Sequence, residues 1–234
     1  MDSPCPVDLA SWRAQLPEAL RLDIAPVADH LSDLPVAEQA LVVAAVRSRR
    51  EEFSSARHLA HRMLSREGVA LQPILCGLDR SPLWPKGWLG SLTHGRKWCA
   101  AALAPIGKAM DGVGIDLEEV RPIREDLFGE ILTPSERKRW TEQSSPNSLA
   151  DRVLACFSIK EAVYKAMHPV GNHGLGFQAM EVLRFDPTGK VHLQAHDDLL
   201  QRLAGRALPQ VLHLRQNDVH LSLAWLGSDV GSAP

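Results

Sequence analysis

The amino-acid sequence predicts an α+β protein whose order of elements permits two similar halves. Two long segments, near residues 35–67 and 147–168, carry apolar residues every three or four positions, which is typical of helices with one buried face. Short segments between and after them alternate apolar with polar residues and are separated by turn residues, which is typical of antiparallel strands. This order of helices followed by strands occurs twice along the 234 residues, although no residue-level repeat is detectable.

Composition narrows the class of protein further. A hydrophobic fraction of 45% supports a real core, and a formal net charge of −2 gives no overall field that would favour nucleic acid. We expect no membrane partner either, because no apolar run reaches the ~18 residues of a membrane-spanning helix and the N-terminus lacks a signal-peptide pattern. Cys5, Cys76, Cys99 and Cys156 form no CxxC pattern, so we expect free thiols and a cytoplasmic protein.

The local patterns predict the individual elements in order. We expect helices at residues 35–50, 52–67, 124–132, 134–141 and 147–168. We expect strands at residues 19–24, 89–93, 97–103, 113–118, 180–185, 191–195, 208–214 and 219–226. Thr133, Pro134 and Glu136 form a capping-box start for the helix at 134–141, and residues 94–96 indicate a hairpin between two strands. The chain end at 227–234 is expected to be frayed.

Acidic residues of two distant segments are the strongest candidates for a functional site. In the strand at 113–118, Asp116 and Glu118 lie on the same face because side chains alternate. In the long helix, Glu161 and Lys165 are one turn apart and share a face. Alone, that helical pair is most simply a surface ion pair worth about 0.3–0.5 kcal/mol. Together with the acidic strand, it indicates a cluster of oxygen ligands that suits Mg²⁺, a hard cation that commonly shares phosphate oxygens.

Basic residues that could neutralise a polyphosphate are spread over the first half of the chain, chiefly Arg57, Arg62, Arg80 and His94. Neither a GxxxxGK[ST] phosphate loop nor a GxGxxG motif opening a helix after a strand occurs. The histidines at 58, 61 and 173 are expected to be ordinary surface residues.

Four short motifs, taken together, resemble those of a known enzyme family. GIDLE at 114–118 and FSIKEAVYK at 157–165 resemble the paired signature GxDxE and [WF]xxKExxxK of the 4'-phosphopantetheinyl transferases. WPKG at 84–87 followed by GSLTH at 90–94 resembles the single WPxG…GSxxH motif of the longer, monomeric type associated with siderophore and secondary-metabolite synthases. Glu52 and Phe53 with Arg57 and Arg62 resemble that type's N-terminal arginine motif. Phe157 stands in place of the commoner Trp.

The resemblance implies a pseudodimer, in which two similar α/β halves enclose an active site in the cleft between them, and therefore a monomer. The N-terminal half, residues 1–110, would bind coenzyme A, and the C-terminal half, residues 111–234, would bind the metal and carry catalysis. The implied reaction transfers the 4'-phosphopantetheine arm of coenzyme A to a serine of an apo acyl or peptidyl carrier protein. It would depend on Mg²⁺, release adenosine 3',5'-bisphosphate, and serve fatty-acid or secondary-metabolite biosynthesis.

By motif matching, the resemblance assigns Asp116, Glu118 and Glu161 to the metal, and Glu161 and Lys165 to catalysis. Glu161 would act as the base on the serine directly or through a metal-bound water, and both routes stay open. Contacts to coenzyme A would come from a larger set, with His94 and Arg57 at the ribose phosphate and Lys165 at the α-phosphate. That set is Arg57, Arg62, Arg80, Thr93, His94, Asp116 and Lys165.

Two alternatives use the same fold without this reaction. One is a catalytically silent homologue that binds carrier proteins, and the other is a Mg²⁺-dependent phosphohydrolase acting on coenzyme A or nucleotides. For the carrier itself, apolar residues at 128–132 and around Trp140 are a hypothetical docking surface.

Overall fold

The computed structural model describes residues 7–107, 110–143, 145–171 and 174–227, so Cys5, His173 and the chain end at 228–234 lie outside the described residues. The first part of the chain forms α1 (Ala10–Arg13), β1 (Arg21–Pro26), α2 (Val36–Gln39), α3 (Arg47–Arg66), β2 (Leu75–Cys76), β3 (Pro82–Leu83), β4 (Trp88–His94) and β5 (Trp98–Pro105). The second part forms β6 (Met110–Glu119), α4 (Phe128–Ile131), α5 (Pro134–Gln143), α6 (Pro146–Met167), β7 (Met180–Phe185), β8 (Val191–Ala195), α7 (Asp197–Leu203), β9 (Gln210–Gln216) and β10 (Val219–Gly227).

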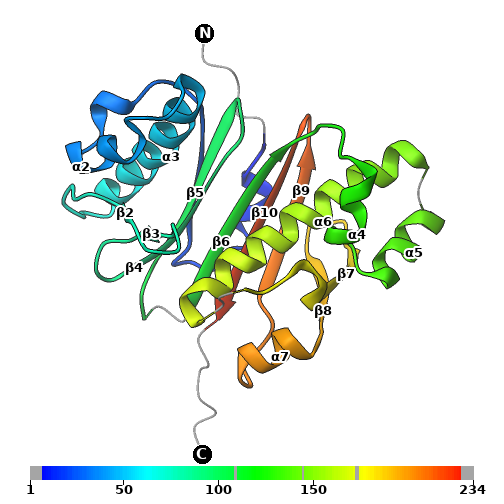
Figure 1. The fold of residues 1–234 in the computed structure, drawn as a ribbon. Helices are drawn as coiled ribbons and strands as arrows, with labels where there is room; N and C mark the ends of the chain where they lie inside the picture. Colours follow the sequence, from blue (N-terminus) through cyan, green and yellow to red (C-terminus); the bar gives the residue numbers. More distant parts are fainter. Residues whose placement is uncertain (1–6, 108–109, 144, 172–173, 228–234) are drawn as a thin grey trace, which may run out of the picture.

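The two parts repeat one topology. Each contains a strand, a long helix, a two-stranded hairpin and then two further strands. The sheets have the orders β1-β5-β4 and β6-β10-β9, so in each the first strand pairs with the last, and the hairpins are β2-β3 and β7-β8. All of these described pairs are antiparallel. The predicted α+β architecture of two similar halves is confirmed, and Figure 1 shows the two halves side by side.

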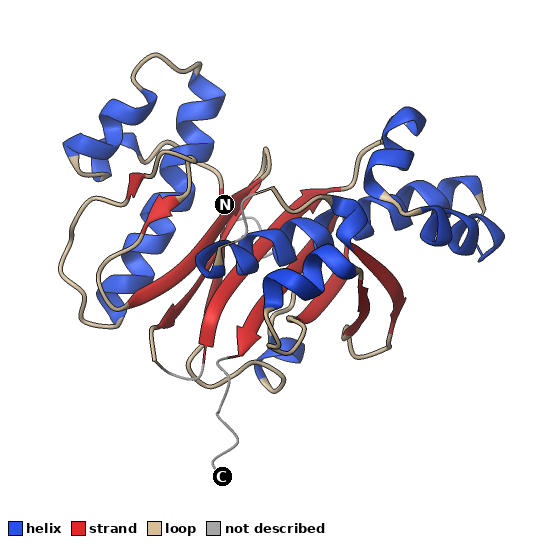
Figure 2. Cartoon of the chain, turned by 60° about the horizontal axis from the view of Figure 1, so that its bottom comes forward, coloured by secondary structure: helices blue, strands red, loops and turns tan. Residues whose placement is uncertain are grey.

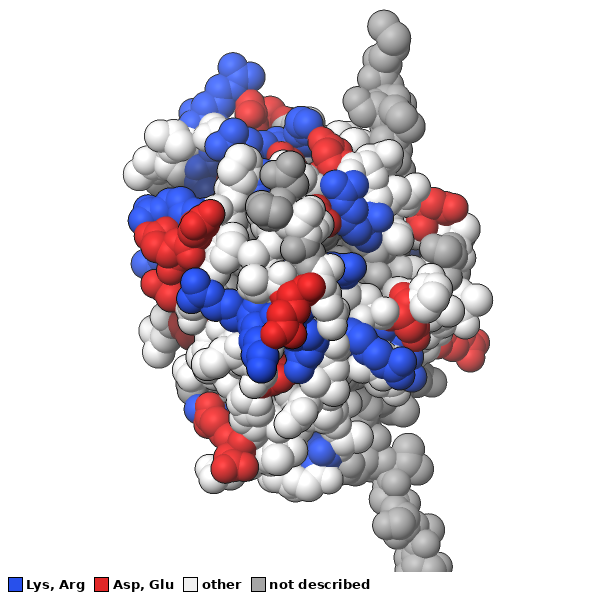
Figure 3. Space-filling view, turned by 90° about the vertical axis from the view of Figure 1, so that its right-hand side faces the viewer, with Lys and Arg blue, Asp and Glu red and all other residues white. Residues whose placement is uncertain are grey.

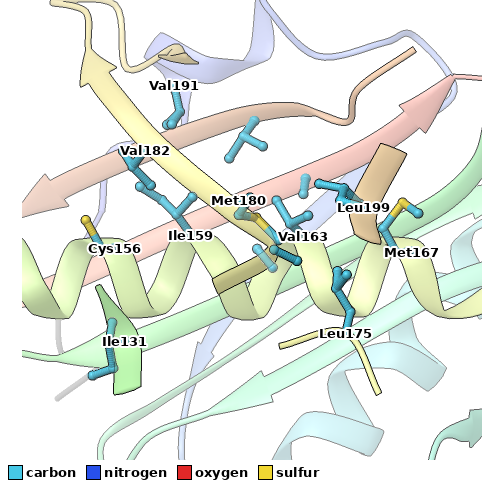
Figure 4. Packing of buried hydrophobic residues seen from close by; sticks show 14 of the residues in the cluster. Ile131, Cys156, Ile159, Val163, Met167, Leu175, Met180, Val182, Val191 and Leu199 are labelled. Carbon is cyan, nitrogen blue, oxygen red and sulfur yellow. The ribbon is translucent and has the colours of Figure 1, made fainter. Parts of the chain in front are cut away.

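Each long helix covers one face of its own sheet. Helix α3 packs Ala56, Leu59 and Met63 against Cys99 and Ala101 of β5. Helix α6 packs on the β6-β10-β9 sheet and also carries the largest apolar cluster. Figure 4 shows that cluster, in which side chains of α6 meet those of β7, β8 and α7. Figure 2 shows the strands in the middle of the molecule with the helices around them.

The sheets are joined where β4 lies beside β6. The buried hydroxyl of Ser91 accepts a hydrogen bond from the Ile115 amide at 3.0 Å, and that of Thr93 accepts one from the Leu117 amide at 3.1 Å. A second apolar cluster contains residues of β5, β6 and β10, covered by Trp12 from the N-terminal segment. The two halves therefore share a core, and their junction is fixed by side chains of β4 that bind the backbone of β6.

A buried ion pair fixes α6 to the two short helices that precede it, α4 and α5. Lys160 is fully buried; its Nζ lies 2.6 Å from Oε2 of Glu136 and donates to the Ile131 carbonyl at 2.8 Å. The predicted capping box is confirmed, because the Thr133 amide donates to Glu136 and the Glu136 amide donates to the Thr133 hydroxyl. Glu136 thus caps α5 and neutralises Lys160 at the same time, so this lysine of the KExxxK motif supports the fold.

Some predicted boundaries are wrong. The break between the expected helices at 35–50 and 52–67 was placed too far along the chain. In the structure α2 is followed by a 3-10 turn at Ala40–Val42, and α3 begins at Arg47. The chain turns there so that Leu34, Val42 and Phe53 pack together. The helix expected at 124–132 is a 3-10 turn followed by the single turn of α4, and α7 was not predicted.

The hypothetical docking surface at 128–132 and Trp140 is also wrong. Phe128, Ile131, Leu132 and Trp140 are buried in the cluster around α6. None of the described helices combines the length and the hydrophobicity needed to cross a membrane. Figure 3 shows one face on which Lys and Arg lie among Asp and Glu.

Candidate active site

Two glycines allow α6 to lie directly on β6. A Cβ atom built on Gly112 would lie 1.9 Å from the carbonyl oxygen of Ala166, and one built on Gly114 would lie 1.9 Å from that of Ala162. Both distances are far below any real contact, so only glycine fits at these positions. Because the backbones approach this closely, α6 brings Glu161 and Lys165 to the face of β6 that carries Asp116.

Asp116 is at the centre of the candidate site. It is 4% exposed, and its Oδ1 lies 2.7 Å from Nζ of Lys165 and 3.5 Å from the hydroxyl of Thr93. Lys165 also donates to the Ile115 carbonyl at 3.1 Å. The other oxygen, Oδ2, is buried without a hydrogen-bond partner among the described residues. A buried carboxylate oxygen left in this way costs free energy unless a cation or water satisfies it.

Glu118 and Glu161 add negative charge beside Asp116. Burial raises the pKa of Glu118, and the charge of Asp116 raises it further, while Arg121, 3.2 Å away, lowers it. Burial likewise raises the pKa of Glu161; nearby Lys165 opposes this shift and Asp116 adds to it. Both glutamates therefore bind protons more readily than exposed ones, as expected for carboxylates that are withdrawn from water.

The donor atoms suit a hard divalent cation. They are carboxylate oxygens, one of them buried and without a partner, and such oxygens are preferred by Mg²⁺, which keeps water molecules as further ligands. The side chains are less tightly gathered than the sequence suggested. Within the described residues, the set of His, Cys, Asp and Glu atoms that lies within 4.8 Å is His30, Asp33 and His58, away from this site.

A cavity of about 580 Å³ lies between the two halves and is lined by Lys165, the partner of Asp116. Residues of the β3–β4 region line one side, and Tyr164, Lys165 and His168 of the α6 end line the other. His168 Nε2 lies 2.6 Å from Asp79 Oδ2 and so closes one edge of the cavity. Hydrogen bonds from Ser81 and then from His168 lower the pKa of Asp79, which keeps this contact charge-assisted. Arg80, predicted to bind coenzyme A, is exposed and lines the cavity.

His94 lies at the end of β4 and is partly buried. Its Nε2 is 2.5 Å from Nη1 of Arg49, and its Nδ1 is 3.6 Å from Glu52. Burial and then the charges of Arg49, Lys165 and Arg57 lower the pKa of His94 to about 4, so the ring is neutral near pH 7. Arg49 was not among the predicted site residues. Its spacing of three residues before Glu52 in a helix is the signal that could have indicated it.

The other predicted arginines lie elsewhere. Arg57 is 7% exposed; it donates to the Ile74 carbonyl at 3.3 Å and stacks 3.7 Å above the Phe53 ring. Burial lowers the pKa of Arg57. Arg62 lines a separate cavity together with His58 and His61. The structure therefore groups Asp116, Glu118, Glu161, Lys165 and Thr93, places His94 and Arg80 at the edge, buries Arg57 and separates Arg62.

A chain of hydrogen-bonded polar side chains reaches the site from behind. It starts at Asp151 on α6, crosses two buried histidines and two buried hydroxyls, and ends at the carbonyl of Asp116; in order, its members are Asp151, His220, His213, Ser222 and Ser158. The successive distances are 3.1, 3.2, 2.9 and 2.8 Å, and Ser158 Oγ is 3.4 Å from the Asp116 carbonyl. Burial lowers the pKa of both histidines, so both rings are neutral near pH 7.

Comparison with known families matches both halves of the chain. Residues 37–104 match the family described as "4'-phosphopantetheinyl transferase N-terminal domain", and residues 112–222 match the "4'-phosphopantetheinyl transferase superfamily".

Individual relatives agree with the family match. The chain is 37% identical over 160 residues to 4'-phosphopantetheinyl transferase PptT of Mycobacterium tuberculosis, covering 66% of this chain and 68% of PptT. It is 35% identical to 4'-phosphopantetheinyl transferase Npt of Nocardia iowensis, covering 62% and 64% of the two chains, so it spans just under two thirds of Npt. Enterobactin synthase component D of Salmonella typhi is 37% identical over 51% of this chain and 49% of its own length.

Among solved structures, the holo-ACP-synthase from Plasmodium yoelii is similar at 21% identity and a TM-score of 0.44, covering 51% of this chain and 96% of that one. The family matches and the curated relatives indicate that the protein is an enzyme of the transferase class. The chain belongs to the 4'-phosphopantetheinyl transferase superfamily, and the N-terminal domain match agrees with its longer type.

Proposed function

We propose that the protein transfers the 4'-phosphopantetheine arm of coenzyme A to a serine of an apo acyl or peptidyl carrier protein, with Mg²⁺, and releases adenosine 3',5'-bisphosphate. The observation that carries this proposal is the contact of buried Asp116 with Lys165, a residue that lines the cavity between the two halves. Membership of the superfamily supports it, as do the names of relatives that are 4'-phosphopantetheinyl transferases.

Coenzyme A would occupy the cavity of about 580 Å³, with its pyrophosphate at Lys165. Asp116, Glu118 and Glu161 would hold Mg²⁺, which when bound supplies positive charge to the pyrophosphate. Lys165 would exchange its contact with Asp116 for the α-phosphate as the leaving group gains charge.

At the far end of coenzyme A, Arg49 would bind the 3'-phosphate, and the neutral ring of His94, whose Nε2 accepts from Arg49, would orient that guanidinium. Thr93 and Arg80 would bind from the β4 side. Arg57 would not contact coenzyme A directly but would support the segment before β2, because its guanidinium donates to the Ile74 carbonyl.

The chemical step would begin when the carrier serine oxygen attacks the β-phosphorus, which bears the pantetheine arm. A new P–O bond forms to serine, and the P–O bond to the bridging oxygen breaks, so that adenosine 3',5'-bisphosphate leaves. Glu161 would take the serine proton, directly or through one water.

The functional division of the chain belongs to the same proposal. Residues 1–110 would form the coenzyme-binding half, and residues 111–234 the metal-binding and catalytic half. The repeated topology supports this division, because it changes over between Pro105, where β5 ends, and Met110, where β6 begins. We also propose that the protein is a monomer, because the second half takes the place of a second subunit, and light scattering of the purified protein tests this. The cytoplasm is the proposed location, because the cysteines form no pattern typical of disulfides.

One assay tests the reaction against its two alternatives. The protein is incubated with coenzyme A, Mg²⁺ and an apo carrier protein, and the carrier is weighed by mass spectrometry. A mass gain of one phosphopantetheine arm supports the proposal. An unchanged carrier and intact coenzyme A would favour a silent carrier-binding homologue, and cleaved coenzyme A with an unlabelled carrier would favour a phosphohydrolase.

A further inference from the structure

Two histidines and one aspartate converge on the outer side of the first half, away from the acidic site. His30 and Asp33 belong to the segment between β1 and α2, and His58 belongs to α3. Nδ1 of His30 is 3.0 Å and Nδ1 of His58 is 3.5 Å from the same oxygen, Oδ2 of Asp33. One ligand atom from each of the three residues lies within 4.8 Å of the others. These residues, called the His–Asp–His cluster below, play no part in the proposed transfer.

The separations fit a tetrahedral zinc ion. Zinc binds histidine nitrogen and carboxylate oxygen at about 2.0–2.2 Å, which puts neighbouring ligand atoms of a tetrahedron roughly 3.3 Å apart. The two nitrogen–oxygen distances of 3.0 and 3.5 Å lie on either side of that value. Because the two rings lie nearly parallel and a metal lies in the plane of each imidazole that binds it, the rings would turn about their side-chain bonds to direct both Nδ1 atoms at one ion.

The backbone that carries the cluster is already fixed. The amide of His30 donates to the hydroxyl of Ser54 at 3.2 Å. The hydroxyl of Ser55 accepts from the Ala28 amide at 2.9 Å and lies 2.7 Å from the Ala28 carbonyl. Ser54 and Ser55 are buried on α3, one turn before His58. Serines of α3 thus hold the backbone of the 28–30 segment against the helix that carries His58, and the rings of His30 and His58 stack with their centroids 4.1 Å apart.

The charges around the cluster also bear on metal binding. Burial and the neighbouring His30 lower the pKa of His58, so its ring is neutral near pH 7, the state in which imidazole binds a metal. Asp33 supplies one negative charge. His61 and Arg62 lie beside His58 and oppose a cation, which limits the affinity. The side chains of the cluster are 28–49% exposed, so water can complete the coordination.

We propose that His30, Asp33 and His58 bind one Zn²⁺, with water as the fourth ligand, and that this ion fastens the segment before α2 to α3. The site would be structural, because no cavity-lining residue of the acidic site belongs to it. It would stabilise the half of the protein that carries Arg49 and His94. Its occupancy would be independent of coenzyme A and of Mg²⁺.

Equilibrium dialysis of the chelator-treated, untagged protein against Zn²⁺ measures the number of ions bound and their affinity. We expect one zinc per chain at this site, and at least a tenfold weaker affinity in His30→Gln and in His58→Gln, because each change removes one of three protein ligands. Co²⁺ in place of Zn²⁺ should give the visible absorption of a tetrahedral site, and the same two variants should lose it.

Three further variants make the result specific. His192→Gln removes a half-buried histidine outside the cluster, and this variant should bind zinc as the unchanged protein does. Asp116→Asn should also retain the zinc, and loss of binding in that variant would assign the ion to the acidic site and overturn the proposal. Asp33→Asn keeps the shape of the carboxylate but lowers its charge, so it tests the cluster even if a histidine variant folds poorly. No bound zinc, or binding unchanged in both histidine variants, would equally overturn the proposal.

Discussion

Replacement of Gly114 by alanine is expected to impair activity by moving α6. The added Cβ would lie 1.9 Å from the Ala162 carbonyl oxygen and 2.5 Å from the Ala166 amide nitrogen, both backbone atoms that no side-chain rotation can move. To reach even 3.0 Å from that oxygen, the helix must retreat by about 1.1 Å. A displacement of about 1 Å between reacting groups can reduce a rate about 10²-fold, and overpacking costs about 1–3 kcal/mol of stability.

The assay measures the rate of carrier labelling together with the melting temperature. Gly129→Ala is the matched control, because Gly129 lies in α4 and a Cβ there meets nothing within 4 Å. In a helix, that control should keep activity and gain up to about 1 kcal/mol of stability. If Gly114→Ala labels the carrier at more than half of the unchanged rate with an unchanged melting temperature, the close approach of α6 to β6 does not determine the site geometry.

Three other predictions test the acidic site and the buried ion pair. Glu161→Gln should lower the transfer rate by about 10²–10³ with the fold intact, and a variant that retains more than a tenth of the activity would remove Glu161 from metal binding and base catalysis. Because the folded-state pKa values of Glu118 and Glu161 are raised above 4.5, the stability that their protonated forms confer is lost as pH rises through those values. Cation binding needs the charged forms, so the melting-temperature increase given by Mg²⁺ with coenzyme A should be larger at pH 8 than at pH 5; an equal or smaller increase would contradict this. Lys160→Met should cost about 3–5 kcal/mol in urea unfolding by leaving Glu136 buried and unpaired, whereas exposed Lys138→Met should change little.

Much of the fold and the centre of the site could be predicted because local signals and global structure agree. The strand at 113–118 alternates regularly, so Asp116 and Glu118 could be placed on one face, and the helical spacing placed Glu161 with Lys165. The hairpin strands of 180–185 and 191–195 coincide with β7 and β8, since turn residues mark their ends. Spacing could not predict that Lys165 binds Asp116, because that contact depends on how closely two backbones approach.

The failures come from contacts between residues far apart in sequence. The break between α2 and α3 was misplaced because residues 47–52 are all good helix formers, while the observed turn depends on the packing of Leu34 on Phe53. The coenzyme A role of Arg57 stays a prediction, but no local pattern indicated that its side chain stacks on the Phe53 ring and donates to the Ile74 carbonyl. His61 was expected on the surface but lies 2.8 Å from the fully buried Glu38, a partner that no local pattern indicates.

The hydrogen-bonded chain behind Asp116 has only one possible polarity. A carboxylate can only accept, so Asp151 requires the proton of neutral His220 to be on Nε2, which leaves Nδ1 to accept from His213. His213 must then be the Nε2 tautomer as well, and its Nδ1 takes the proton of Ser222. Ser222 can now only accept from Ser158, whose single proton is directed to it at 2.8 Å, while the Asp116 carbonyl is left at 3.4 Å. A single carboxylate on α6 thus determines the tautomers of two buried rings and the direction in which two buried hydroxyls donate.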